Sequence, residues 1–211
     1  RIFDGDRGPN TGGMGAFTPT PTVDGAFLEE VRERVLLPTV REMRRRGTPF
    51  RGALYAGIML TRDGLRVLEF NARFGDPETQ PILMRLASDL VPALLGAARG
   101  DLSPVRLEVD PRAAVGVVMA AEGYPGRVTT GDVIDGAEGP FPSGAQIFQA
   151  GTRRGADGRL VTSGGRVLTV CALGADRAEA AARAYETVAR VQFRGAQYRR
   201  DIGRTGPGEA K

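Results

Sequence analysis

Three polar side chains at alternate positions of one short segment are the residues best suited to chemistry in this sequence. Glu69, Asn71 and Arg73 alternate with apolar or small residues. Because successive side chains of a strand point to opposite faces, we expect these three to share one face, roughly 6.6 Å apart, with apolar neighbours packed on the other. Carboxylate and amide oxygens can hold Mg²⁺, and arginine can grip a phosphoryl group with two hydrogen bonds. The pattern predicts a site for a metal-bound polyphosphate; the alternative is an exposed strand face with a weak surface ion pair.

A glycine-rich segment near the start of the sequence is a second candidate site. Its residues are Asn10, Thr11, Gly12, Gly13, Met14 and Gly15. Consecutive amides without large side chains can form a concave nest for a phosphate or a carboxylate. The segment lacks the Gly-Lys-Ser/Thr of a Walker A motif and the strand-to-helix spacing of a dinucleotide fingerprint. An anion cradle and a flexible connection both remain open, and the presence of the Glu-Asn-Arg pattern favours the cradle.

The sequence contains no histidine, which excludes whole classes of mechanism. Serine-histidine hydrolases, histidine-ligated zinc enzymes and cysteine-histidine proteases all require it, so carboxylates, arginines, backbone amides and bound metal remain. The only lysine is Lys211, although chemistry on ATP usually enlists a lysine at the phosphates. Either arginine replaces it or the lysines lie elsewhere, and we expect these residues to be the later half of a longer enzyme.

Composition restricts the partners and the compartment. The single cysteine, Cys171, lies in an apolar run, so an internal disulfide is excluded and a buried thiol is favoured over a nucleophile. The net charge of +4 comes from scattered arginines, and the cluster at 44–46 fits the last turn of a helix. No apolar stretch approaches the ~20 residues that span a bilayer, and the sequence as given begins at Arg1 without a charged-then-apolar leader pattern. We expect a soluble cytoplasmic protein, or a piece of one, without nucleic-acid or membrane partners.

Local signals place the polar triad on a hairpin. Residues 5–24 are rich in glycine and proline and are expected to be loop. Asp24 can cap a helix, and Pro38 is expected to start a second one or to mark a kink. Residues 53–60 and 65–71 indicate two strands, joined by a tight turn in which the pair Asp63-Gly64 supplies positive φ.

Two further helices are expected after the triad. Asp76 is predicted to cap the first, with Pro77 at its first helical position. The second is expected to begin at Ser88-Asp89 and to end at Gly100. The polar residues 101–111 then break the pattern, and we expect a domain boundary there.

The second half indicates a small α+β domain. Strands are predicted at 113–120, 146–150 and 166–173, and Asp176 can cap a last helix. The helix is expected to cover an antiparallel sheet. Residues 203–211 are expected to be a frayed tail. The fold class is therefore α+β, with domains at 1–108 and 109–211.

With these motifs assembled, the sequence resembles the C-terminal half of the glycinamide ribonucleotide synthetase (phosphoribosylamine-glycine ligase) family, of the ATP-grasp superfamily. In the first half, the similar stretches are Asp-Gly-Asp (4–6), Gly-Pro-Asn-Thr-Gly-Gly-Met-Gly-Ala (8–16), Leu-Tyr-Ala-Gly (54–57) and Leu-Glu-Phe-Asn-Ala-Arg-Phe-Gly-Asp-Pro-Glu-Thr-Gln (68–80). In the second half, they are Gly-Tyr-Pro-Gly (123–126), Ala-Gly-Thr (150–152), Gly-Gly-Arg-Val-Leu (164–168) and Tyr-Arg-Arg-Asp-Ile-Gly (198–203). Few families combine these stretches.

The resemblance implies a reaction and a set of roles. Glycine would be ligated to 5-phosphoribosylamine through glycyl phosphate, with ATP cleaved to ADP and phosphate. Glu69 and Asn71 would hold Mg²⁺ or Mn²⁺, while Arg73 and Asp6 would be catalytic. The acceptor substrate would face Asn10, Thr11, Gly12, Gly13, Met14 and Gly15. Asp76 would help to fix the start of its helix beside the metal.

The resemblance also implies what these residues lack and which rivals remain. Residues 1–108 would be the later part of an ATP-grasp catalytic domain, with an antiparallel sheet and flanking helices. The N-terminal half of the same enzyme, with most of the ATP lid, would be a required partner, so this piece would be inactive alone. The alternatives are another carboxylate-amine ligase, a noncatalytic nucleotide- or anion-binding module, and a basic RNA-binding domain, which would show steeply salt-dependent binding.

Overall fold

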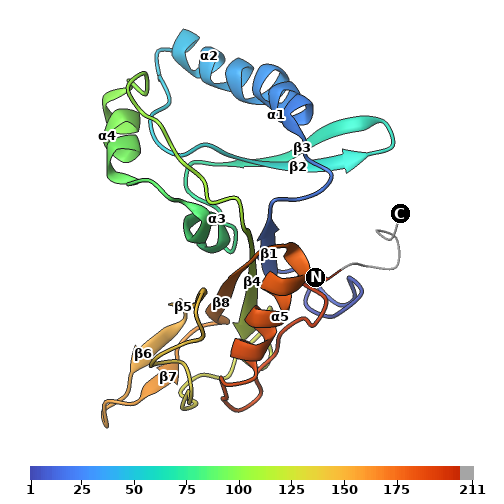
Figure 1. Ribbon diagram of the computed structural model, residues 1–211, viewed down its shortest axis with the longest axis vertical. Helices are drawn as coiled ribbons and strands as arrows, with labels where there is room; N and C mark the ends of the chain where they lie inside the picture. Colours follow the sequence, from blue (N-terminus) through green and yellow to red (C-terminus); the bar gives the residue numbers. More distant parts are fainter. Residues whose placement is uncertain (205–211) are drawn as a thin grey trace. The chain divides into compact units, whose positions relative to one another are not determined.

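The computed structural model describes residues 1–204, which form two compact units (Figure 1). The first unit contains Arg1–Thr18, Asp76–Arg85 and the described residues from Asp110 onward. The second contains Pro19–Gly75 and Leu86–Val109. Each unit draws on segments that are distant in the sequence, and the domain division at 108/109 stays a prediction.

The first unit is built on a four-stranded antiparallel sheet in the order β1-β4-β8-β5. Its strands are β1 (Gly15–Thr18), β4 (Ala113–Ala120), β5 (Ala145–Gln149) and β8 (Arg166–Gly174). Helix α5 (Arg177–Val188) packs against β4 and β8 (Figure 1), and α3 (Thr79–Arg85) also contacts these strands. The predicted strands at 113–120, 146–150 and 166–173 are confirmed within a residue or two.

The core of this unit follows from the alternation of side chains along β4 and β8. Val117 and Leu168 are fully buried in one cluster with Ala184 of α5. Cys171 is also fully buried, and a methyl group on Gly116 would lie 3.0 Å from its Sγ. Burial raises the pKa of the Cys171 thiol. The prediction of a structural thiol is therefore confirmed.

Three strands of the first unit were not expected. Residues 5–24 were predicted to be loop, but Gly15–Thr18 form the edge strand β1, which pairs with β4. A methyl group on Gly15 would lie 2.5 Å from the Gly116 carbonyl oxygen, so glycine permits the close approach of the two strands. The other two, β6 (Thr152–Arg154) and β7 (Leu160–Thr162), form a hairpin. All three are too short to show a clear alternating pattern.

Helices and a hairpin make up the second unit. Helix α1 (Gly25–Val31), a π-helical segment (Arg32–Leu36) and α2 (Leu37–Arg45) follow one another without a break. The Asp24 carboxylate accepts a hydrogen bond from Phe27 N at 2.8 Å, which confirms it as the cap. Pro38 is the second residue of α2, directly after the π-helical segment, so the expected second helix continues from the first without a break. Helix α4 (Val91–Arg99) is capped at its C-terminus by Gly100, as predicted, but it begins at Val91 rather than at Ser88-Asp89.

The hairpin of the second unit carries the polar triad. Strands β2 (Tyr55–Thr61) and β3 (Gly64–Asn71) pair in antiparallel register. Gly64 has φ +94°, whereas Asp63 is not in the positive-φ region, so glycine alone supplies the turn geometry expected of the pair. A register shift between Gly57 and Ile58 interrupts the pairing opposite Leu68.

Two remaining predictions concern α3 and the tail. The expectation that Asp76 caps α3 is wrong, because the helix begins at Thr79 and Pro77 precedes it. The Asp76 carboxylate instead bonds the side chains of Gln80 and Arg166. Of the predicted tail, residues 205–211 lie outside the described part of the chain. No helix within residues 1–204 has both the length and the apolar character that a membrane span requires.

Candidate functional site

Glu69 and Asn71 lie side by side at the end of β3. The Asn71 amide nitrogen donates a hydrogen bond of 3.0 Å to Glu69 Oε1, so the two side chains share a face, as predicted. Gly57 pairs with Glu69 across the hairpin, and a methyl group on this glycine would lie 3.2 Å from Glu69 Cγ. Because the hydrogen bond uses the amide nitrogen, the amide oxygen of Asn71 and a carboxylate oxygen of Glu69 are left for a cation.

Arg73 lies beyond the strand rather than on it. The strand ends at Asn71, and the backbone bends at residues 72 and 73. The Arg73 guanidinium is exposed and donates to the Phe74 carbonyl oxygen at 2.9 Å. The prediction that Arg73 shares the strand face is therefore wrong, because the two-residue period requires extended backbone.

The opposite face of the hairpin was expected to be packed, and this expectation is wrong for the described residues. Leu68 is 64% exposed and Phe70 is 45% exposed. In the part of the chain that the structure describes, β2 and β3 pair only with each other, so no wider sheet supports a packed layer.

The donor set fits a cation that arrives with a phosphate ligand. Within residues 1–204, no group of three or more His, Cys, Asp or Glu residues could hold a metal ion. Mg²⁺ is usually held through one or two protein ligands, with phosphate oxygens and water completing its shell. The pair Glu69 and Asn71 suits that role and would be a poor structural metal site.

The glycine-rich segment is more tightly engaged than a nest of free amides. Gly12 N donates to the Tyr124 hydroxyl at 3.0 Å, and Gly13 N donates to Thr11 Oγ1 at 3.1 Å. Met14 is 3% exposed and packs in a small core cluster, while Gly15 belongs to β1. The nest expected from the sequence is therefore not formed at Gly12 and Gly13 in this conformation.

Arg166 and Tyr124 contact this loop and were not predicted as site residues. Arg166 donates to the carbonyl oxygen of Gly12 at 2.8 Å and to Asp76 Oδ2 at 2.8 Å. Both residues lie in stretches that carried the family resemblance, at 123–126 and 164–168. That was the only signal, because a lone tyrosine in a turn or a lone arginine at the start of a strand has no distinctive spacing.

Asp6 is held by a network of charged groups. Its Oδ1 accepts a hydrogen bond of 2.7 Å from Arg199, and its side chain is 78% exposed. Arg199 also contacts both carboxylate oxygens of Asp201, each at 2.7 Å, and Gly5 N donates to Asp201 Oδ2 at 2.9 Å. Asp6 has φ +53°, an uncommon conformation for a residue other than glycine. The network fixes the backbone around the predicted catalytic carboxylate.

The same network predicts a pH dependence of stability. The Arg199 hydrogen bonds lower the pKa of Asp201 from 3.8 to about 2. Because the folded pKa lies below the unfolded one, the added stability is fully present above about pH 4 and is lost as the pH falls toward 2. We expect Asp201→Asn to destabilise the chain at pH 7 and the difference from the unaltered chain to shrink below pH 4. Urea unfolding across this range measures it.

The control for this prediction is Asp135→Asn, which removes an exposed carboxylate 3.8 Å from Arg159. It should change the free energy of unfolding by less than about 0.5 kcal/mol at either pH. A difference for Asp201→Asn that stays constant from pH 7 to pH 2 would contradict the assignment of the low pKa.

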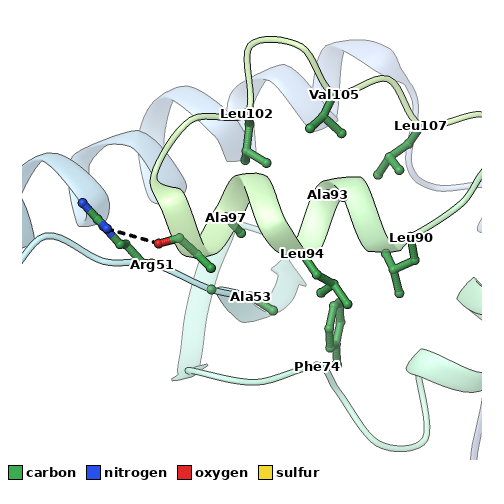
Figure 2. A pocket seen from close by; sticks show the side chains of 12 residues that line it. Arg51, Ala53, Phe74, Leu90, Ala93, Leu94, Ala97, Leu102, Val105 and Leu107 are labelled. Carbon is green, nitrogen blue, oxygen red and sulfur yellow. Dashed lines mark hydrogen bonds between the residues drawn. The ribbon is translucent and has the colours of Figure 1, made fainter.

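An apolar groove lies along α4 in the second unit (Figure 2). Its volume is about 610 Å³, and Figure 2 shows Leu102, Val105 and Leu107 on one side of it. At one end Arg51 donates to the Ala98 carbonyl oxygen at 3.1 Å (Figure 2). None of the predicted site residues lines this groove, and its chemistry suits apolar groups rather than phosphate.

The predicted residues divide between the two units. Glu69, Asn71 and Arg73 belong to the second unit, while Asp6, the glycine-rich loop and Asp76 belong to the first. Within the first unit, Arg166 joins the loop to Asp76. The assignment of catalytic, binding and metal-ligand roles to these residues stays a prediction.

Comparisons with known proteins found two family models that match this chain. The model of the phosphoribosylglycinamide synthetase ATP-grasp (A) domain matches residues 1–79, and the model of the C domain of the same synthetase matches residues 114–205. The chain belongs to the phosphoribosylglycinamide synthetase family. The family resemblance and the ATP-grasp fold predicted from the sequence are thereby confirmed.

Individual members of the family are similar along nearly the whole chain. The phosphoribosylamine-glycine ligases of Caulobacter vibrioides and Streptomyces coelicolor are 48% and 52% identical over 206 and 208 residues, 96% of this chain in each case. A crystal structure of phosphoribosylamine-glycine ligase from Thermotoga maritima superposes with a TM-score of 0.81 at 40% identity over 95% of this chain. These matches cover 48%, 49% and 49% of the relatives, so the chain spans about half of their length.

Proposed function

We propose that this chain provides the catalytic half of a phosphoribosylamine-glycine ligase, which joins glycine to 5-phosphoribosylamine in purine biosynthesis. One observation carries the proposal. The Asn71 amide nitrogen lies 3.0 Å from Glu69 Oε1, so the two side chains share one face of the strand, where their oxygens can serve as ligands for a phosphate-bound cation. The relatives that bear this ligase name, at 48% and 52% identity, support it.

The proposed reaction has two steps. A carboxylate oxygen of glycine attacks the γ-phosphorus of ATP. The bond between that phosphorus and the β,γ-bridging oxygen breaks, so that ADP departs and glycyl phosphate is formed. The amine of phosphoribosylamine then attacks the glycyl carbonyl carbon and loses a proton. The bond between that carbon and the phosphate oxygen breaks, which gives the amide and inorganic phosphate. ATP thus serves as co-substrate and activates the carboxylate.

The second unit would serve the phosphoryl step. Glu69 and Asn71 would hold the divalent cation, Mg²⁺ or Mn²⁺, which neutralises charge on the phosphate oxygens when bound. Arg73 is exposed and donates to the carbonyl oxygen of the neighbouring Phe74, and its guanidinium would turn to the transferred phosphoryl group.

The first unit would serve the amide-forming step. Asp6 would act beside the acceptor amine, because its carboxylate is 78% exposed and fixed in direction by Arg199. Asn10 and Thr11 would bind the same substrate, with Gly12, Gly13, Met14 and Gly15 shaping the loop. Asp76 would act on the loop through Arg166 rather than as a helix cap.

The proposal includes a partner and a compartment. The chain would work with an N-terminal half that corresponds to the part of the relatives it does not span, would be inactive without it, and would act in the cytoplasm. We call the chain joined to the N-terminal half of the Streptomyces coelicolor relative the completed ligase.

Calorimetric titration of Mg-ATP into the completed ligase tests the proposal, together with an assay of amide product formation. We expect binding that weakens at least tenfold in Glu69→Ala. The control Glu138→Ala, which removes an exposed carboxylate paired with Arg154, should leave binding unchanged. If Mg-ATP binds equally to the unaltered ligase, Glu69→Ala and Glu138→Ala, and no amide is formed, the result would instead support a noncatalytic nucleotide-binding module.

A further inference from the structure

The Arg166 guanidinium joins two segments that are far apart in the sequence. Its Nη1 donates to the carbonyl oxygens of Gly12 at 2.8 Å, Gly13 at 3.4 Å and Asp76 at 2.7 Å. Its Nη2 donates to Asp76 Oδ2 at 2.8 Å. The side chain is 22% exposed, so most of the guanidinium is enclosed by these partners. One side chain therefore fixes both the glycine-rich loop and the residue before Pro77.

The two glycines are shaped to this contact. A methyl group on Gly12 would lie 3.2 Å from Arg166 Cζ, so the bare backbone lies against the guanidinium. Gly13 has φ +110°, and a methyl group on it would lie 2.5 Å from Pro77 Cδ. The loop thus needs glycine at position 13 to rest on Pro77, while a side chain at position 12 would press on the Arg166 guanidinium.

Tyr124 holds the same loop from its amide side. Its hydroxyl accepts the Gly12 N–H at 3.0 Å, while Arg166 bonds the Gly12 carbonyl oxygen. A methyl group on Gly165 would lie 2.4 Å from Tyr124 Cδ2, so the ring packs directly on the residue before Arg166. The peptide groups on either side of Gly12 are therefore held by two neighbouring side chains.

These contacts indicate that Arg166 fixes the geometry of the loop backbone and does more than form an ion pair with Asp76. Nη1 bonds three main-chain carbonyl oxygens while Nη2 bonds a carboxylate oxygen, and the single nitrogen of a lysine, with three donors, cannot supply both positions of this planar fork. The fourth acceptor is the carboxylate of Asp76, a residue that comes five positions after Asn71 in the sequence. The same guanidinium therefore fixes the loop that precedes β1 and the segment that follows the predicted metal ligands.

We propose that Arg166 is a positioning residue of the ligase reaction, which fixes the glycine-rich loop so that Asn10 and Thr11 meet the acceptor amine in one geometry, with Tyr124 as its partner on the loop. The proposal rests on the proposed function, because the loop must face the acceptor substrate. It assigns no contact between Arg166 and any substrate.

Hydrogen exchange at the backbone amides of residues 10–15 tests the clamp in the 211-residue chain itself. We expect the backbone amides of Gly12 and Gly13 to exchange at least tenfold faster in both Arg166→Met and Arg166→Lys than in the unaltered chain. Tyr124→Phe, which removes only the hydroxyl, should accelerate Gly12 alone. The matched control Arg154→Met removes an exposed arginine that also bonds a carbonyl oxygen, that of Gly158, and should change neither amide.

Kinetics of the completed ligase test the positioning role. We expect the KM for phosphoribosylamine to rise at least tenfold in Arg166→Met and Arg166→Lys, with the KM for ATP within twofold of the unaltered enzyme. A structural role alone would lower the amount of active enzyme and leave both KM values unchanged.

The outcomes separate the proposals. Unchanged exchange in Arg166→Met, or full recovery in Arg166→Lys, would overturn the clamp. Faster exchange with an unchanged KM for phosphoribosylamine would overturn the positioning role. If the completed ligase forms no amide, the proposed function is rejected. Faster exchange of the loop amides in the Arg166 variants would still support the clamp, because hydrogen exchange does not depend on turnover.

Discussion

Glu69→Gln should lower the turnover of the completed ligase at least ~10²-fold while leaving the fold intact. The substitution keeps the size of the side chain and its place beside Asn71, which bonds it at 3.0 Å, but removes the charge that a divalent cation requires. The expected loss is comparable to that of one oxyanion-hole donor, because both remove charge stabilisation at the transferred group. Initial rates of ADP release at saturating ATP and glycine give the measurement.

Arg73→Ala should produce a loss of similar size, because it removes the guanidinium assigned to the phosphoryl group. Glu138→Gln serves as the matched control for Glu69→Gln: it neutralises another exposed glutamate, paired with Arg154, and should retain full turnover. Normal product formation by Glu69→Gln would refute its assignment as a metal ligand. Normal product formation by Arg73→Ala would refute the role given to Arg73.

Gly13→Ala is expected to destabilise the first unit strongly. Its φ of +110° lies in the left-handed region, which costs an alanine about 1–2 kcal/mol. The added methyl group would also lie 2.5 Å from Pro77 Cδ, and overpacking of this kind costs about 1–3 kcal/mol. We therefore expect the free energy of unfolding to fall by about 2–5 kcal/mol in urea titrations.

Gly139→Ala isolates the steric part of that loss. Gly139 has a similar φ of +118°, but a methyl group there would meet no atom within 4 Å. This variant should lose only the conformational cost of about 1–2 kcal/mol. If the free energy of unfolding falls equally in the two variants, the contact of the loop with Pro77 does not contribute to the loss of stability in Gly13→Ala.

Local signals predicted much of the fold because they depend on neighbours in the sequence. Asp24 and Asp176 each cap a helix through a hydrogen bond of 2.8 Å to an amide three residues later, which lies within a single helical turn. The apolar runs of β4 and β8 likewise follow from their burial on both faces. The failure at Asp76 has the opposite cause, because its carboxylate bonds Arg166, 90 residues away.

The sequence by itself determined the chemistry of the candidate site. The absence of histidine, the alternation of Glu69 with Asn71 and the family motifs all depend on residue type and spacing. Only the tertiary structure decided that Gly12 and Gly13 are engaged by Tyr124 and Arg166, and that the apolar face of β3 is exposed. The physical reason is that hydrogen bonds between distant segments, and the burial of a strand face, depend on which elements meet in space, and residue spacing does not encode that.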